Sequence, residues 1–209
     1  MNRRAMNLTS RIRSFAMIFA ATLMLAACGP AQEPLDQAPL AGATIGGDFT
    51  LADKSGKAVR WADFKGKWRI VYFGFTFCPD ACPTDVQRLM NGFALYARSE
   101  PKLAKQVQPI FITIDPARDT PARVGEFTAA FSPDLMGLTG TPEQIAAATK
   151  AFAVYSARGE NIPGGYLMDH SRNAYLFDPE GKPIALLPID KDAKTAPKAI
   201  AAELIRWVR

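Results

Sequence analysis

Cys78 and Cys82 lie in the segment GFTFCPDACPTD, residues 74–85, with three residues between them. That spacing corresponds to about one helical turn, so both sulfurs can point to the same side. The geometry permits a structural disulfide, a redox couple or two ligands of a metal. Pro79 and Pro83 restrict the loop, which reduces the conformational entropy lost when the two sulfurs are held together.

The spacing of the pair and the scarcity of further donors bear on these alternatives. The dithiol motif of thioredoxin-type enzymes has two intervening residues rather than three. A structural zinc site needs four protein ligands, commonly two cysteine pairs, whereas this chain has one further cysteine. Two thiolates and one imidazole form a soft three-ligand set, and thiolates select Cu(I) among the common metals.

His170, in the segment GYLMDHSRN, is the single histidine of the sequence. Neutral imidazole is a frequent metal ligand, and a dithiol that lacks a third donor makes His170 a candidate for that position. The adjacent Asp169 is a candidate to orient the ring as a hydrogen-bond acceptor. A loop cap or a solvated charge is the alternative interpretation of Asp169, and we assign Met168 to core packing.

The N-terminus is typical of an export signal. Basic residues precede the thirteen-residue run FAMIFAATLMLAA, residues 15–27, which is shorter than the roughly 20 residues of a membrane-spanning helix. The segment Leu25-Ala26-Ala27-Cys28 resembles a bacterial lipobox, which predicts cleavage before Cys28 and lipid attachment to that residue. An ordinary signal peptide or an uncleaved anchor is the alternative.

These features predict the organisation and location of the chain. We expect a lipoprotein-type signal peptide over 1–27, a flexible tether over 28–43, rich in Pro, Ala and Gly, and a folded domain over 44–209. The protein would be tethered to a membrane on the bacterial periplasmic side by lipid on Cys28. Thiols in that compartment are oxidised unless they are used or protected.

The charge of the chain gives no indication of nucleic-acid binding. The formal net charge is +5, but four arginines and no acidic residue lie within the first 27 positions. The remainder is nearly neutral and has no basic stripe interleaved with aromatic residues.

The elements that must position the candidate residues alternate between strand and helix patterns from Ile45 onward. An N-terminal β-hairpin is predicted from 48–51 and 58–61, around the turn Lys54-Ser55-Gly56-Lys57. Apolar runs typical of buried central strands occupy 69–77 and 107–114. Further short strands are expected at 135–138, 166–168, 173–177 and 183–187. Helical patterns cover 83–97, 121–131, 142–152 and 196–208.

This order predicts an α/β fold of the thioredoxin-like type, with a mixed central sheet flanked by helices. The cysteine pair then lies between the first central strand and its following helix, with Cys82 as a candidate N-cap residue. A thiolate at a helix N-terminus has a lowered pKa. Asp119 or Thr120 is expected to cap the helix that starts at Pro121.

Three motifs in order resemble the SCO/SenC family of membrane-tethered, thioredoxin-like copper proteins. They are FTFCPDACPTD, FITIDPARDTP at 111–121, and DHS at 169–171 followed by YLFDPEG. The resemblance covers about residues 44–209 and implies one copper per chain, as Cu(I) and also as Cu(II). Cys78 and Cys82 would be the thiolate ligands and His170 the imidazole ligand.

The resemblance also implies a partner. The family is expected to deliver copper to, or reduce cysteines at, the binuclear copper site of cytochrome c oxidase subunit II, and another cuproprotein is the alternative receiver. A lipid on Cys28 departs from family members that use a transmembrane helix, and it leaves the copper site unchanged.

Three hypotheses of function result. The first is a metallochaperone that transfers copper by ligand exchange, without small-molecule substrate or ordinary enzymatic turnover. The second is a thiol–disulfide oxidoreductase or redox sensor that uses the Cys78/Cys82 pair. The two are compatible, because oxidation to a Cys78–Cys82 disulfide would abolish copper binding. A purely structural disulfide is the third, and it leaves the placement of the pair and of His170 unexplained.

Overall fold

The computed structural model of the chain describes residues 33–209. The predicted signal peptide, the lipobox and Cys28 lie outside the described residues. Between positions 33 and 209, none of the helices combines the length and the apolar composition needed to cross a membrane.

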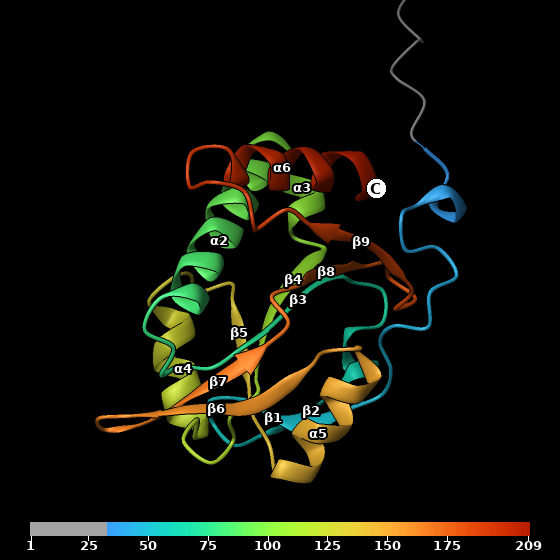
Figure 1. Cartoon of the computed structure of the whole chain (residues 1–209). Helices are drawn as coiled ribbons and strands as arrows, with labels where there is room; N and C mark the ends of the chain where they lie inside the picture. The colour runs from blue at the N-terminus through green and yellow to red at the C-terminus, as the bar shows by residue number, and fades with distance from the viewer. Residues whose placement is uncertain (1–32) are drawn as a thin grey trace, which may run out of the picture. The chain divides into compact units, whose positions relative to one another are not determined.

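A five-stranded mixed sheet, ordered β5-β4-β3-β8-β9, lies at the centre of the fold (Figure 1). Its strands are β3 (Trp68–Gly74), β4 (Val107–Thr113), β5 (Met136–Leu138), β8 (Ala174–Phe177) and β9 (Pro183–Leu187). β4 runs parallel to β3 and β5, whereas β8 runs antiparallel to β3 and β9. Every residue of β3 is buried, as expected for a central strand that is covered on both faces. The predicted α/β fold with a mixed central sheet is confirmed.

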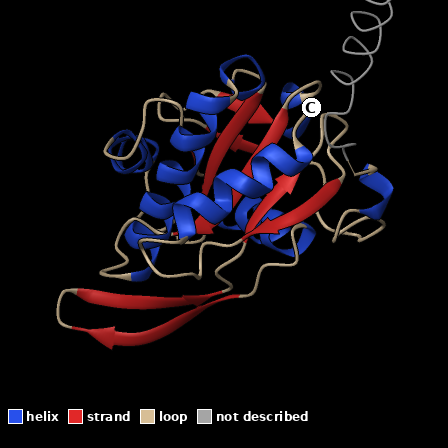
Figure 2. Cartoon of the chain, turned by 90° about the horizontal axis from the view of Figure 1, so that it is seen from above, coloured by secondary structure: helices blue, strands red, loops and turns tan. Residues whose placement is uncertain are grey.

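Helices pack around this sheet (Figure 2). They are α2 (Ala81–Ser99), α3 (Pro101–Ala104), α4 (Pro121–Ala129), α5 (Pro142–Ala151) and α6 (Ala196–Trp207), with short 3-10 turns η2 (Leu35–Gln37) and η3 (Trp61–Phe64). α2 and α6 lie against each other, and a Cβ atom added at Gly92 of α2 would stand 2.6 Å from the Ile200 side chain of α6. Glycine at this position therefore permits the close approach of the two helices.

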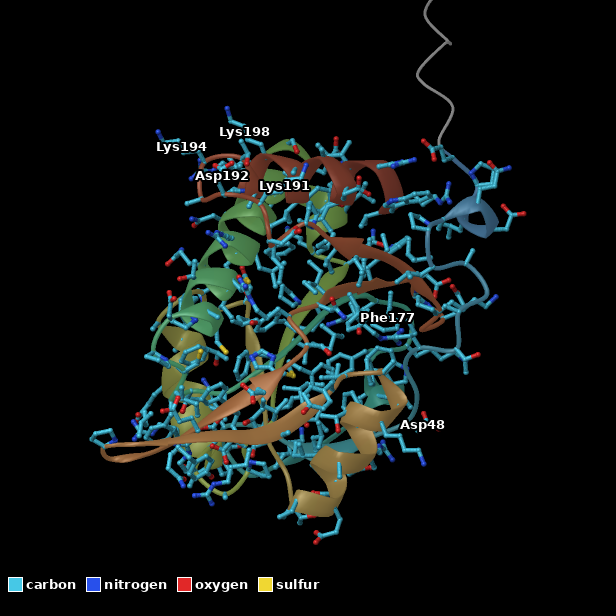
Figure 3. All side chains as sticks on the ribbon, viewed as in Figure 1. Asp48, Phe177, Lys191, Asp192, Lys194 and Lys198 are labelled. Carbon is cyan, nitrogen blue, oxygen red and sulfur yellow. The ribbon has the colours of Figure 1, made fainter. Side chains whose placement is uncertain are left out.

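The helix starts follow their local sequences. Thr120 caps α4 by accepting a hydrogen bond from the Arg123 backbone N–H at 3.3 Å, and Thr141 caps α5 in a reciprocal arrangement with Gln144. Before α6, the Asp192 carboxylate accepts backbone hydrogen bonds from Lys194 and Thr195. Figure 3 labels Asp192 among the exposed lysines of this turn.

Two β-hairpins lie outside the central sheet. β1 (Thr50–Ala52) and β2 (Ala58–Arg60) pair antiparallel, which confirms the predicted N-terminal hairpin. β6 (Ser156–Ile162) and β7 (Gly165–His170) form a separate two-stranded ribbon that projects from the body of the domain (Figure 2). The sequence did not predict β6.

Residues 33–43, which the sequence assigned to a flexible tether, pack against the domain. The Glu33 carboxylate accepts two hydrogen bonds from the Arg206 guanidinium, at 3.0 and 2.7 Å. The Leu40 backbone N–H donates to the Ile184 carbonyl at 3.0 Å, and Ala38 is buried. Residues 33–209 form one compact unit, so packing begins before the expected boundary at 44.

Candidate functional site

The cysteine pair lies where β3 passes into α2. α2 begins at Ala81, and Asp80 occupies the N-cap position, so Cys82 is the second helical residue rather than the N-cap considered from the sequence. Both cysteines are free thiols; Cys78 is half-buried and Cys82 is fully buried. The Cys82 backbone N–H donates to the Cys78 sulfur at 3.3 Å. The sulfur of Cys78 therefore lies at the helix start, where backbone N–H groups have no partner within the helix.

The two sulfurs have opposite acid–base properties. A hydrogen bond from the Cys82 thiol, followed by those from the Cys82, Asp80 and Ala81 backbone, lowers the pKa of Cys78 from 9.0 to about 5, against the opposing effect of burial. The hydrogen bond to Cys78 and burial both raise the pKa of Cys82. At neutral pH, Cys78 is therefore the thiolate and Cys82 the thiol of the pair.

His170, the last residue of β7, contacts the sulfur of Cys82. Its Nε2 atom lies 3.3 Å from Cys82 Sγ, and its Nδ1 atom lies 2.9 Å from the Ser171 carbonyl oxygen. A carbonyl oxygen can only accept, so Nδ1 carries a proton, and Nε2 is the ring nitrogen that faces the sulfur. The rings of Tyr72 and Phe75 meet the imidazole edge-on, with centroids 6.3 and 6.1 Å away.

Asp169, expected to orient the imidazole, is exposed on β7. Side chains alternate along a strand, and the Asp169 carboxylate lies over Gly159 of β6, 3.0 Å from the position of an added Cβ atom. In the structure, the carbonyl of Ser171 accepts the hydrogen bond that the sequence interpretation gave to Asp169.

Asp85 connects the cysteine helix to the segment that follows His170. The carboxylate is completely buried and accepts hydrogen bonds from Arg172 Nε at 2.8 Å and Nη2 at 2.6 Å. The Tyr72 hydroxyl donates to the same carboxylate at 3.1 Å, and Arg88 lies 3.6 Å away. Asp85 falls within the helix predicted over 83–97, but the sequence did not predict this network.

Asp119 fixes the loop that precedes Cys78. Its buried carboxylate accepts from the Thr76 backbone N–H at 3.0 Å and the Thr76 hydroxyl at 2.6 Å, and from the Thr113 hydroxyl at 2.6 Å. Burial raises the pKa of Asp119 above its usual value. Thr120 alone has the capping role considered for the two residues, and Asp119 instead joins the cysteine loop to the end of β4.

The three candidate ligands meet through Cys82, which contacts Cys78 on one side and His170 on the other. Within residues 33–209, no three His, Cys, Asp or Glu side chains are already arranged as a metal site. The donor set nevertheless fits copper: two sulfurs suit Cu(I), and an imidazole nitrogen adds a ligand suited to Cu(II).

Fold and site together define a thioredoxin-like domain with a dithiol at a helix start and an imidazole supplied by a separate β-ribbon. The model of the SCO1/SenC family matches residues 37–206, and the chain belongs to this family. It is 46% identical to protein SenC of Rhodobacter capsulatus over 141 residues, which are 67% of this chain and 62% of SenC.

Solved structures agree with this assignment. Bradyrhizobium japonicum ScoI with copper bound is 36% identical, with a TM-score of 0.69 over 78% of this chain and 99% of ScoI. A SCO1/SenC family lipoprotein from Bacillus anthracis is 25% identical, with a TM-score of 0.61 over 78% of this chain and 94% of that protein. The chain spans about half the length of several curated relatives that it matches.

Proposed function

We propose that this chain is an extracytoplasmic, membrane-tethered copper carrier for the assembly of cytochrome c oxidase. It binds one copper through Cys78, Cys82 and His170, and it delivers the metal to, or reduces cysteines at, the binuclear copper site of subunit II. Family membership and the similarity to ScoI with copper bound support copper as the cargo.

The observation that carries the proposal is the 3.3 Å contact between His170 Nε2 and Cys82 Sγ. The Ser171 carbonyl accepts the Nδ1 proton, so Nε2 is the ring nitrogen placed to bind a metal. Cys78 is already a thiolate at neutral pH, because its pKa is about 5. Of the two cysteines, Cys82 is the one that has to release a proton when copper binds.

Attachment to a membrane through Cys28 is part of the proposal. The basic stretch, the apolar run and the lipobox of the first 28 residues support it, as does similarity to a family lipoprotein. Other relatives are mitochondrial proteins, so the bacterial periplasmic location rests on the N-terminal sequence.

The acidic thiol of Cys78 favours thiol–disulfide exchange as a second candidate function. The half-buried Cys78 thiolate would attack one sulfur of a target disulfide and release the other as a thiolate. Cys82, once deprotonated, would then attack the Cys78 sulfur of the mixed disulfide and release the second target thiolate. The target gains two electrons, and Cys78 and Cys82 become a disulfide.

Copper stoichiometry tests the carrier proposal. Residues 33–209 would be reduced, loaded anaerobically with Cu(I) and desalted against a competing chelator, beside the Cys78→Ser, Cys82→Ser and His170→Ala variants. We expect one copper per chain, lost in both cysteine variants and weakened without His170. Absence of retained copper, with rapid exchange with a protein disulfide, would overturn the carrier function in favour of an oxidoreductase. Equal retention by wild type and His170→Ala would remove His170 from the ligand set.

A further inference from the structure

His170 stands on an element that the central sheet does not hold. Among the described strands, β6 and β7 pair only with each other, and the ribbon projects from the domain in Figure 2. The short connection of residues 171–173 leads from β7 into β8 of the central sheet. The ribbon is also held by the Tyr166 hydroxyl of β7, which donates to Asp115 at 2.8 Å, so the connection is the attachment that lies beside the imidazole.

The connection is fastened to the cysteine helix by an ion pair whose carboxylate is buried. Arg172 comes two residues after His170, and Asp85 comes three residues after Cys82. The guanidinium binds the Asp85 carboxylate through two nitrogens, at 2.8 and 2.6 Å. A two-point contact of this kind fixes the orientation as well as the distance of its partners.

The intervening Ser171 transmits this restraint to the imidazole ring. Its carbonyl accepts the Nδ1 proton of His170, while its own N–H donates to the Tyr155 carbonyl at 3.0 Å. The peptide that orients the ring thus lies directly between the histidine and the arginine bound to α2.

We propose that the Asp85–Arg172 pair is a positioning device that holds the His170 imidazole against Cys82. The inference deepens the proposed copper function and rests on it for its consequence, which is selectivity between oxidation states. Neither Asp85 nor Arg172 makes a hydrogen bond to Cys78 or Cys82, so the pair acts on the nitrogen donor more directly than on the sulfurs. Cu(II) requires that nitrogen more than Cu(I) does, because soft thiolates suffice for Cu(I).

A copper-free measurement tests the positioning directly. The Arg172→Leu variant of residues 33–209 removes the guanidinium without adding a metal ligand, and Asp85 keeps its contacts with Tyr72 and Arg88. NMR of the ring would follow the Nδ1 proton and the cross-relaxation between His170 and Phe75. We expect faster exchange of that proton and weaker cross-relaxation in Arg172→Leu.

Arg206→Leu is the matched control. Arg206 also binds a carboxylate, that of Glu33, through two nitrogens, and its side chain is 44% exposed against 47% for Arg172. An unchanged His170 signal in Arg172→Leu, or an equal change in both variants, would overturn the proposal. If Arg172→Leu does not fold by circular dichroism, Arg172→Lys takes its place, because lysine keeps the charge but loses the two-point contact.

Copper titration tests the consequence. We expect the Cu(II) affinity of Arg172→Leu to fall about 10–100-fold, the usual effect of losing a group that orients a ligand, with a much smaller change for Cu(I). Equal losses for both oxidation states would refute selectivity and indicate a general structural role. Failure of wild type to bind copper would refute the proposed function, while the copper-free NMR result would still decide whether the ion pair positions the ring.

Discussion

Replacement of Cys82 by alanine tests the physical origin of the Cys78 thiolate. The hydrogen bond from the Cys82 thiol is the largest influence that lowers the pKa of Cys78 to about 5. Alanine removes this donor and leaves the backbone N–H groups at the start of α2. We therefore expect the pKa of Cys78 to rise in Cys82→Ala while staying below its ordinary value of 9.0.

The size of the Cys78 pKa shift decides which measurement can detect it. A thiol with a pKa of about 5 is roughly 99% ionised at pH 7, whereas one with a pKa of 9 is about 1% ionised. The more acidic thiolate is intrinsically less nucleophilic, by about 40–100-fold for a difference of four pKa units. Because these effects nearly cancel at neutral pH, a single rate at pH 7 does not distinguish them, but a pH profile does.

The assay is alkylation of the reduced domain by iodoacetamide from about pH 4 to pH 9, a range that spans both ionisation midpoints. Mass spectrometry would assign the modified cysteine. In the wild type, the Cys78 rate should reach a plateau above about pH 6, and in Cys82→Ala the midpoint should lie higher. In Cys78→Ala, the buried Cys82 should stay unreactive through neutral pH. A wild-type midpoint at the ordinary thiol value, or an unshifted midpoint in Cys82→Ala, would refute this account.

The free energy of unfolding of the reduced domain should rise from about pH 5 to pH 9, since Cys78 is ionised in the folded state and protonated in the unfolded state within that window. The slope is at most about 1.4 kcal/mol per pH unit, and solvent screening reduces it. The stabilisation is lost as the pH falls through about 5. Urea titrations that give the same slope for Cys78→Ser would contradict the assignment of this stabilisation to Cys78. Asp119→Ala should lower the free energy of unfolding by about 2–4 kcal/mol, because Thr76 and Thr113 lose a buried charged acceptor for their hydrogen bonds. Asp53→Ala, which removes an exposed turn carboxylate, is the control, and equal losses would argue against burial as the cause. Leu204→Ala should lower the free energy of unfolding by about 2–5 kcal/mol, because it leaves a cavity. Ile205 is half-exposed, and Ile205→Ala should change the free energy of unfolding by no more than about 0.5 kcal/mol. Comparable losses for the two variants in urea unfolding would show that the outer face of α6 is packed.

The elements that the sequence predicted well are those with a strong burial pattern. β3 and β4 are apolar runs in the centre of the sheet, and α4 and α5 begin at Thr-Pro steps whose threonines cap them. β6 was missed because its sequence, SARGENI, is mostly polar and none of its residues is buried. Within the described part of the chain, β6 and β7 pair only with each other, so no buried face requires apolar and polar residues to alternate along β6.

The sequence indicated which residues are candidates for the site, but it did not indicate the contacts that hold them. The resemblance to the SCO/SenC family implied that Cys82 and His170 share a site, and the structure places their side chains 3.3 Å apart. The pairing of Asp85 with Arg172 spans 87 positions, and neither residue has a local pattern that names its partner. The sequence offered Asp119 or Thr120 as the cap of α4; Thr120 is the cap, and the Asp119 carboxylate faces the loop of Thr76.

These contacts bear on how the proposed carrier releases its cargo. Cys82 and His170 are each held from within the fold, Cys82 in the buried turn of α2 and His170 through Ser171. Cys78, which is half-buried like His170, is the more exposed of the two cysteines, and its sulfur lies at the start of the helix. An incoming thiolate from a receiving protein can therefore approach the metal most easily beside Cys78. If copper transfer proceeds by ligand exchange, as proposed, Cys78 is the ligand that should be replaced first, while Cys82 and His170 keep the metal in place during the exchange.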